Sequence, residues 1–149
     1  MAVDQSYVGR VYPPTEPYEV GREKIREFAD SINDPNPVYR DREAAAALGY
    51  PDVIAPPTFP IVLTLRAGHQ VIMDPEIGID YSRVVHGEQR FVHHRPVTAG
   101  DVLQVVVTIA DIRAAAGNDI VTTQAEVTTV DGEPVVTATS TIVARGTAA

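Results

Sequence analysis

The feature that most constrains the fold is a segment near the middle of the chain that is apolar on almost every side. Residues 58–73 are predicted to form a helix, with Thr58 as its cap and Pro60 in the first turn, where proline is tolerated. The apolar residues surround most of this helix and do not form a single stripe: Phe59, Ile61, Val62, Leu63, Leu65 and Ala67. A helix of this kind has to be covered by other structure. The rest of the chain is therefore expected to wrap around it.

The chain after residue 80 can provide that cover, because its pattern changes to the alternation of β-strands. Four segments rich in Val, Ile and Thr are predicted strands: 83–92, 102–109, 120–130 and 135–145. Asp131-Gly132 predicts a two-residue hairpin with both residues at positive φ. Gly117-Asn118 marks another turn, and residues 97–101 link the first two strands. With an early strand over residues 15–20, the sheet would have five or six strands.

Two shorter helices are predicted before the central one. Residues 22–33 carry one apolar stripe, and the Asp34-Pro35 step ends that helix because proline restricts the residue before it. Residues 42–48 follow, with Asp41 as N-cap and Gly49 in the left-handed turn at the end. A buried helix followed by an antiparallel sheet that curls around it is the hot-dog arrangement, an α+β fold. We expect residues 1–149 to form one such domain.

Composition excludes several functional classes. The formal net charge is −8 and the pI about 4.8, which argues against sequence-independent binding of nucleic acid. The chain has no cysteine, so it has no disulfide and no thiolate nucleophile. No apolar run approaches the ~20 residues that span a bilayer, and residues 1–10 lack the apolar core of a signal peptide. These observations predict a soluble cytoplasmic protein.

Four segments together resemble a known family, and the match as a whole extends from about residue 20 to 145. They are Asp34-Pro35-Asn36-Pro37-Val38-Tyr39, Ile54-Ala55-Pro56-Pro57-Thr58-Phe59, residues 85–91 (VHGEQRF) and residues 95–101 (RPVTAGD). Their order and spacing resemble the MaoC-like, R-specific enoyl-CoA hydratases, which have the hot-dog fold. The first segment corresponds to the family's Asp-x-Asn-Pro-x-His, and the second to the Ile-Ala-His-Gly at the start of its central helix.

The resemblance also shows where this chain departs from the family's chemistry. In the family, the Asp and His transfer protons, and a backbone N–H at the start of the central helix polarises the thioester carbonyl. Asp34 is retained here, but Tyr39 stands in place of the histidine, and a phenol with a pKa near ~10 does not cycle a proton at neutral pH. Pro56 and Pro57 stand in place of the His and Gly, and proline has no N–H to donate. The N–H of Thr58 could substitute only if the chain were displaced by one residue.

Each of these candidate residues also has a purely structural interpretation. Asp34 on its own is a feeble base, and a turn in which it bonds to Asn36 or the following backbone explains it equally well. His93 and His94 are neighbours in a predicted strand and face opposite ways, so one metal cannot easily take both rings. His69 and His86 have no ligand spacing around them. No Gly-x-Ser-x-Gly elbow and no glycine-rich phosphate loop is present, and we expect neither a metal nor a cofactor.

Among these proteins, the chain is most similar to the HadA-type subunit of (3R)-hydroxyacyl-ACP dehydratases and to the N-terminal hot-dog half of two-domain, FAS1-like dehydratases. The resemblance implies a subunit that binds an acyl-CoA or acyl-ACP thioester while a MaoC-like partner supplies catalysis. The expected substrate contacts are Asn36, Pro57, Thr58, Phe59 and Leu63, with Ala67 further along the helix. Two alternatives remain open. One is a homodimeric acyl-thioester binding protein, and the other is an active hydratase or thioesterase that uses Asp34 with Tyr39.

Overall fold

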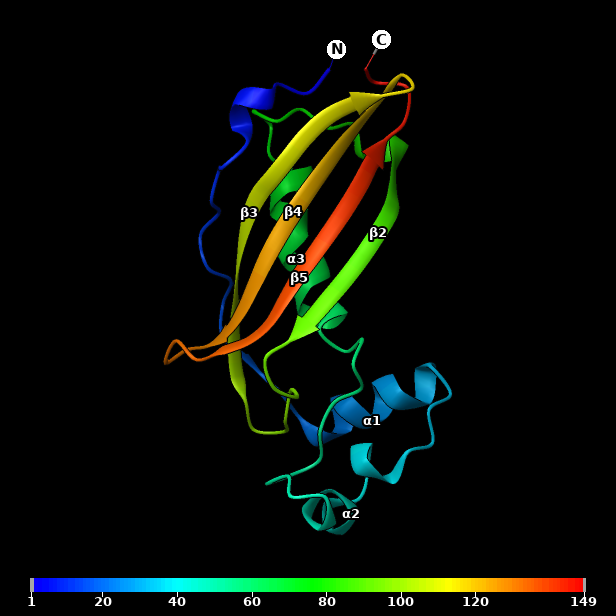
Figure 1. The fold of residues 1–149 in the computed structure, drawn as a ribbon, viewed down its shortest axis with the longest axis vertical. Coiled ribbons are helices and arrows are strands. Elements are labelled where there is room, and N and C mark those ends of the chain that lie inside the picture. Colours follow the sequence, from blue (N-terminus) through cyan, green and yellow to red (C-terminus); the bar gives the residue numbers. More distant parts are fainter. Residues whose placement is uncertain (1, 149) are drawn as a thin grey trace.

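The computed structural model describes residues 2–148 and contains one curved antiparallel sheet with the strand order β1-β3-β4-β5-β2. Its strands are β1 (Tyr18–Glu19), β2 (Val84–His93), β3 (Val102–Ala115), β4 (Asn118–Thr129) and β5 (Pro134–Ala144). The four long strands run side by side along most of the long axis of the molecule, and the ends of the chain lie together at one end of it (Figure 1). The predicted hot-dog fold and the five-stranded sheet are confirmed. The early strand, predicted over 15–20, is reduced to two residues.

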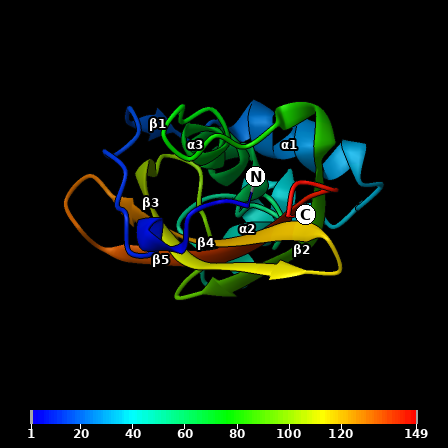
Figure 2. The ribbon, with the colours of Figure 1, turned by 90° about the horizontal axis from the view of Figure 1, so that it is seen from above.

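The central helix α3 (Ile61–Ile72) lies on one face of this sheet (Figure 2). Leu63, Ala67 and Val71 are buried on the side that meets the sheet. On the other side, 44% of Leu65 is exposed, and so is 65% of Met73 just after the helix. The chain therefore covers its apolar helix on one side only, and the cover expected all round is incomplete.

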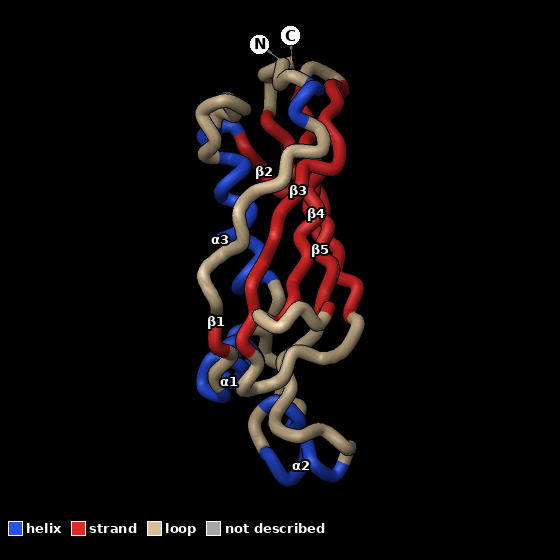
Figure 3. The backbone as a smooth tube through the Cα atoms, turned by 90° about the vertical axis from the view of Figure 1, so that its left-hand side faces the viewer, coloured by secondary structure: helices blue, strands red, loops and turns tan. Residues whose placement is uncertain are grey.

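The shorter helices α1 (Arg22–Ser31) and α2 (Arg42–Ala47) sit beyond one end of the long strands (Figure 3). Asp41 caps α2 as predicted, because its carboxylate accepts from the N–H of Glu43 at 2.9 Å. Gly49 follows that helix with φ of +87°, the left-handed conformation that favours glycine. No helix within residues 2–148 is long and apolar enough to cross a membrane.

The predicted start of the central helix is wrong by three residues. Helix α3 begins at Ile61 with Pro60 as its N-cap, and Thr58 makes no capping bond. Phe59 precedes a proline and is therefore disfavoured in the helical region. The chain instead makes a tight turn before the helix, in which the Phe59 N–H donates to the carbonyl of Pro56 at 2.9 Å.

The tight two-residue hairpin also lies elsewhere than predicted. Ala116 and Gly117 both have positive φ, and they join β3 directly to β4. Of Asp131 and Gly132, only the glycine has positive φ, in a four-residue loop over 130–133. The two-residue turn predicted at Asp131-Gly132 is therefore wrong. Asp131 alone does not impose the left-handed conformation that this type of turn needs at both of its central residues.

A bulge at Gly87 sets which way β2 points its side chains. His86 pairs with Ile142 and Glu88 with Thr141, so Gly87 is an extra residue in the ladder. Beyond the bulge, Gln89, Phe91 and His93 stand opposite Ser140, Ala138 and Val136 of β5. Ala138 and Val136 are buried on the side of the sheet that α3 covers. A Cβ on Gly87 would lie 3.3 Å from a methyl carbon of Val143, so the position favours glycine. Because of this shift, His93 faces the helix side.

Candidate functional site

The loop that carries Asp34 is built from two consecutive side-chain turns. The Asp34 carboxylate accepts from the N–H of Asn36 at 3.1 Å, and the Asn36 side chain accepts from the N–H of Val38 at 3.1 Å. Arg40 fastens the loop by donating to the carboxylate of Asp30 and to the carbonyl of Asp34. The turn interpretation of Asp34 is therefore confirmed, and its carboxylate is partly used in holding the loop.

The segment before α3 brings this loop next to the end of β2. Ile54 donates to the carbonyl of Val38 at 3.3 Å, and Ala55 donates to that of Val97 at 2.7 Å. Between these segments lies a pocket of about 250 Å³, which we call the head pocket. It is lined by Tyr39, Ile54, Ala55, Pro57, His93, Arg95 and Pro96. Two expected site residues, Tyr39 and Pro57, thus share one pocket with a histidine that the sequence did not single out.

Tyr39 is buried, with 7% of its surface exposed. Burial raises the pKa of its phenol, and the nearby negative charge of Asp34 raises it further. The hydroxyl is consequently protonated at neutral pH. It can donate a hydrogen bond in the head pocket, but it cannot act there as a base.

We expect the Tyr39 phenol to titrate above the ordinary tyrosine pKa of ~10. The ultraviolet titration of the wild-type chain minus that of Tyr39→Phe should isolate this step. Folding raises the pKa of Tyr39. Its contribution to the free energy of unfolding is therefore fully present below pH ~10 and is lost as the pH rises through the pKa of the folded state. The same subtraction with Tyr12→Phe isolates a second buried phenol for comparison. Burial and the 2.7 Å hydrogen bond that its hydroxyl donates to Asp74 raise the pKa of Tyr12 to about 12. A Tyr39 step near neutral pH would contradict the expectation.

The start of the helix offers no donor toward His93. Pro57 has no N–H, and its carbonyl contacts Nε2 of His93 at 2.7 Å. No peptide bond in the described residues is cis, so the Thr58 N–H points opposite to the Pro57 carbonyl and away from that imidazole. Within residues 2–148, nothing accepts a hydrogen bond from the Thr58 N–H. The Thr58 N–H is the substitute donor that the sequence left possible. It is thus unpaired, but it points away from His93.

From the sequence, His93 was expected not to share a metal with His94. The structure places it in the wall of the head pocket, while the ring of His94 contacts Thr137 at 3.0 Å. The two rings thus have separate partners, as the strand alternation predicted. The one sequence signal for the inward position of His93 was Gly87, because a glycine inside a strand pattern suggests a bulge.

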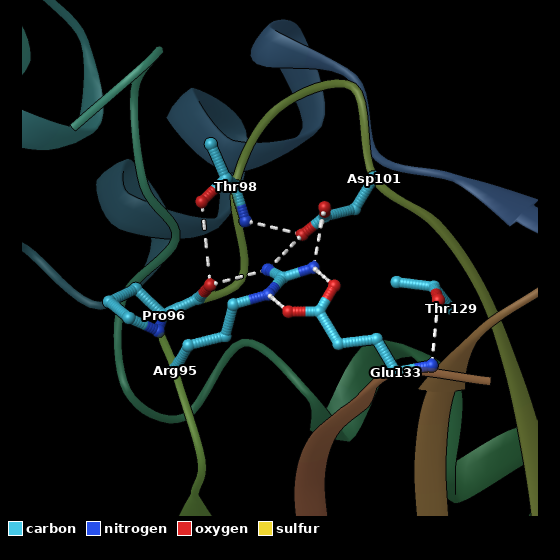
Figure 4. A network of polar contacts seen from close by, with 6 residues as sticks. All are labelled: Arg95, Pro96, Thr98, Asp101, Thr129 and Glu133. Atoms are coloured by element: carbon cyan, nitrogen blue, oxygen red, sulfur yellow. Dashed lines mark hydrogen bonds and ion pairs between the residues drawn. The ribbon is translucent and has the colours of Figure 1, made fainter. Parts of the chain in front are cut away.

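Arg95 holds the wall beside His93 in a fixed position (Figure 4). Its guanidinium donates to both carboxylate oxygens of Asp101 at 2.9 and 3.0 Å, and to Glu133 at 2.8 Å. Asp101 also accepts from the N–H of Thr98 at 2.8 Å. These hydrogen bonds raise the pKa of Arg95, with Asp101 contributing most. A planar guanidinium with two carboxylate partners ties the end of β2 to the β4–β5 loop. The Arg-Pro-Val-x-x-Gly-Asp turn is therefore a structural support of the pocket.

The other expected contacts are dispersed. Asn36 and Thr58 are exposed, whereas Phe59 is fully buried and packs edge-on against Phe28 with ring centroids 5.5 Å apart. Leu63 borders a different pocket, together with Tyr18 and Arg66. The role of these residues as acyl contacts stays a prediction. In the described part of the chain, no group of three or more His, Cys, Asp or Glu residues gathers as metal ligands.

A second cavity lies between α3 and the sheet, and we call it the α3 slot. Thr64, Leu65 and Gly68 line it on the helix, and His86, Gln89, Thr123 and Ser140 are among the sheet residues that line it. His86 faces the slot before the bulge, and the shift at Gly87 turns Gln89 to the same face of β2. The slot could not be predicted from the sequence, because its lining comes from five separate elements, namely α3, β2, β3, β4 and β5.

Comparison with known proteins supports one family. A UPF0336 protein of Saccharopolyspora erythraea is 64% identical over 148 residues, which cover 99% of this chain and 95% of the relative. C-terminally truncated HadBC, a (3R)-hydroxyacyl-ACP dehydratase complex of Mycobacterium tuberculosis, has a chain with 36% identity and a TM-score of 0.84. That match covers 96% of this chain and 99% of that one.

A MaoC-like dehydratase of known structure is 37% identical with a TM-score of 0.87, and the match covers 94% of this chain and 42% of that one. The similarity to MaoC-like hot-dog dehydratases inferred from the motifs is therefore confirmed. The family model for the FAS1-like dehydratase domain region matches residues 6–138. The chain belongs to this family of FAS1-like dehydratase domains.

Proposed function

We propose that this chain, acting as one hot-dog domain, is the acyl-binding subunit of a (3R)-hydroxyacyl-thioester dehydratase in fatty-acid metabolism. The reaction is loss of water from the hydroxyacyl thioester, and a MaoC-like partner hot-dog provides the base and the oxyanion donor. The solved relative HadBC, a (3R)-hydroxyacyl-ACP dehydratase complex, supports both the reaction class and the pairing.

One observation carries the proposal: in the head pocket Tyr39 and Pro57 stand where the family has its base and its donor, and the imidazole that is present, His93, has its Nε2 against the Pro57 carbonyl at 2.7 Å. Loss or addition of water requires a group that exchanges a proton near neutral pH and a donor for the enolate oxygen. The position of the base is taken by Tyr39, whose raised pKa keeps it protonated. The position of the donor is taken by Pro57, and its peptide turns the next N–H away from His93. An acyl thioester can bind beside such a pocket without reacting.

The unpaired side of the fold supports a partner. Among the described residues, strand β2 ends the sheet and pairs with β5 alone, so one edge of its backbone is available to another strand. Apolar side chains are exposed on the open side of α3, just after it, and shortly before β2: Leu65, Met73 and Tyr81. An apolar helix covered on one side only is a surface that a second hot-dog would complete.

The test is hydration of crotonyl-CoA by the purified chain alone, by a MaoC-like protein carrying the Asp-x-Asn-Pro-x-His segment alone, and by the mixture. We expect the mixture to turn over at least 10-fold faster than the sum of the two proteins assayed separately. Binding of the acyl thioester with no turnover in any pairing would indicate the homodimeric binding protein instead. Turnover by this chain alone, abolished in Asp34→Ala, would indicate an independent hydratase.

A matched pair of variants tests the pairing surface. Leu65→Glu places a charge on the open side of α3, and Val130→Glu places one on the β4–β5 loop, where the replaced side chain is equally exposed at 44%. Because an unpaired charge is costly to bury in an interface, Leu65→Glu should weaken the complex at least 10-fold and Val130→Glu should not. Size-exclusion chromatography of the mixtures measures this. Equal effects of the two variants would contradict the pairing through this face.

A further inference from the structure

The α3 slot contains a buried hydroxyl that no other group of the described chain pairs with. Thr64 is 7% exposed and lines the slot, and its Oγ1 has no hydrogen-bond partner within residues 2–148. In a helix, a threonine hydroxyl often bonds back to a carbonyl one turn earlier, and here it does not. Leaving such a hydroxyl unpaired is unfavourable, because folding removes it from solvent without a replacement bond. Its partner is therefore to be sought in the slot itself.

Three polar side chains form a row on the sheet wall of the same slot, and we call them the polar row. Thr123 of β4 pairs with Ser140 of β5, and Ser140 pairs with Gln89 of β2. All three line the slot, as Thr64 does. The amide nitrogen of Gln89 donates to the carbonyl of Thr139 at 3.3 Å, which leaves its amide oxygen as an acceptor. Polar groups thus line both walls, but the Thr64 hydroxyl bonds directly to none of the row.

The polar row lies between two apolar pairs on the same face of the sheet. These are Ala125 with Ala138 on one side and Val121 with Ile142 on the other, and all four residues are buried. The free space in the slot is about 30 Å³. One water needs roughly 10–15 Å³ of such space and two to four polar partners. The slot therefore fits a water molecule and excludes a larger ligand.

From these observations we infer that the α3 slot is a binding site for one water molecule, which bridges the hydroxyl of Thr64 to the polar row. Water suits the site because it donates and accepts hydrogen bonds in the smallest volume. A water-mediated bond is enthalpically nearly as good as a direct one. The bridge ties the first half of α3 to the middle strands of the sheet. The inference does not depend on the proposed acyl-binding function.

The first test is a high-resolution crystal structure of the wild-type chain and of two variants. In the wild type, we expect a water about 2.6–3.2 Å from Oγ1 of Thr64 and from at least one oxygen of the polar row. Its occupancy should fall by half or more in Thr64→Val, which keeps the shape of the side chain and removes the hydroxyl. Thr64→Ser should retain the water. A slot without water in the wild type, or full occupancy in Thr64→Val, would overturn the inference.

Denaturant unfolding tests the bridge in solution. Thr64→Val should lower the unfolding midpoint, because the water loses a partner. In a dry slot the same change would remove an unpaired hydroxyl and raise the midpoint. Thr123→Val acts on the same water, so the unfolding equilibrium constant of the double variant should depart from additivity by at least about 3-fold.

Thr122→Val is the matched control for this cycle. Thr122 is the neighbour of Thr123 on the opposite face of β4, where its hydroxyl contacts that of Thr141 at 3.2 Å. Its effect should therefore add to that of Thr64→Val. A raised midpoint in Thr64→Val, or additive effects for both pairs of variants, would contradict a bridging water.

Discussion

Changing Tyr39→His and Pro57→Gly together is expected to give this chain crotonyl-CoA hydration of its own, on the order of 10⁴-fold above the unmodified chain. The first change supplies an imidazole that exchanges protons near neutral pH, a contribution of about 10²- to 10⁴-fold. The second supplies an N–H at the start of α3, and a donor of this kind contributes about 10²- to 10³-fold. Each change alone should give much less, because one missing group still limits the reaction. Initial rates of thioester hydration measure the gain.

The carboxylate of Asp34, which the chain retains, provides the control for this gain in hydration rate. Asp34→Ala in the doubly changed chain should remove the acquired rate, since the family's reaction uses the carboxylate and the imidazole together. If the unmodified chain already hydrates crotonyl-CoA at the rate of the double variant, Tyr39 and Pro57 are not the defects and the acyl-binding role fails. If the double variant gains nothing while its fold and acyl affinity are intact, the site of chemistry lies elsewhere.

Phe59→Ala is expected to lower the free energy of unfolding by about 3–5 kcal/mol. Phe59 is the largest side chain that is completely buried, and its ring packs against that of Phe28. Removing it leaves a cavity at the junction between α1 and the start of α3. Phe91→Ala is the matched control, because Phe91 is only partly buried and should lose distinctly less stability. Denaturant unfolding of both variants measures the difference.

This experiment also decides between two roles for Phe59. From the sequence, Phe59 was expected to line the acyl chain, whereas its position in the structure is that of a core residue. A large loss of stability with unchanged acyl affinity in Phe59→Leu supports the core role. Wild-type stability in Phe59→Ala combined with weakened acyl binding would restore the role of a chain contact.

Several parts of the site could be predicted because local chemistry decides them. The Asp34–Asn36 turn and the Asp41 cap follow from short polar side chains that bond to backbone groups two residues away. The lack of a donor at Pro57 follows from covalent structure alone. The opposite environments of His93 and His94 follow from the alternation of a strand. None of these needs information from a distant part of the chain.

What could not be predicted depends on contacts between distant segments. The position of His93 in the head pocket requires the bulge at Gly87, and its meaning depends on the pairing of β2 with β5. The unpaired hydroxyl of Thr64 becomes visible only when α3 is packed on the sheet. The start of α3 depends on Pro56, Pro57 and Pro60 acting together, because as a group they impose a turn before the helix.

By itself, the sequence determined that an apolar helix would lie on a curled antiparallel sheet and that two chemical groups would be missing, because periodicity and side-chain identity are local properties. Only the tertiary structure decided which imidazole faces the head pocket, which way the Thr58 N–H points, and which hydroxyl is left without a partner. A peptide plane and a buried side chain are oriented by everything that packs around them, and those neighbours come from segments far apart in the chain.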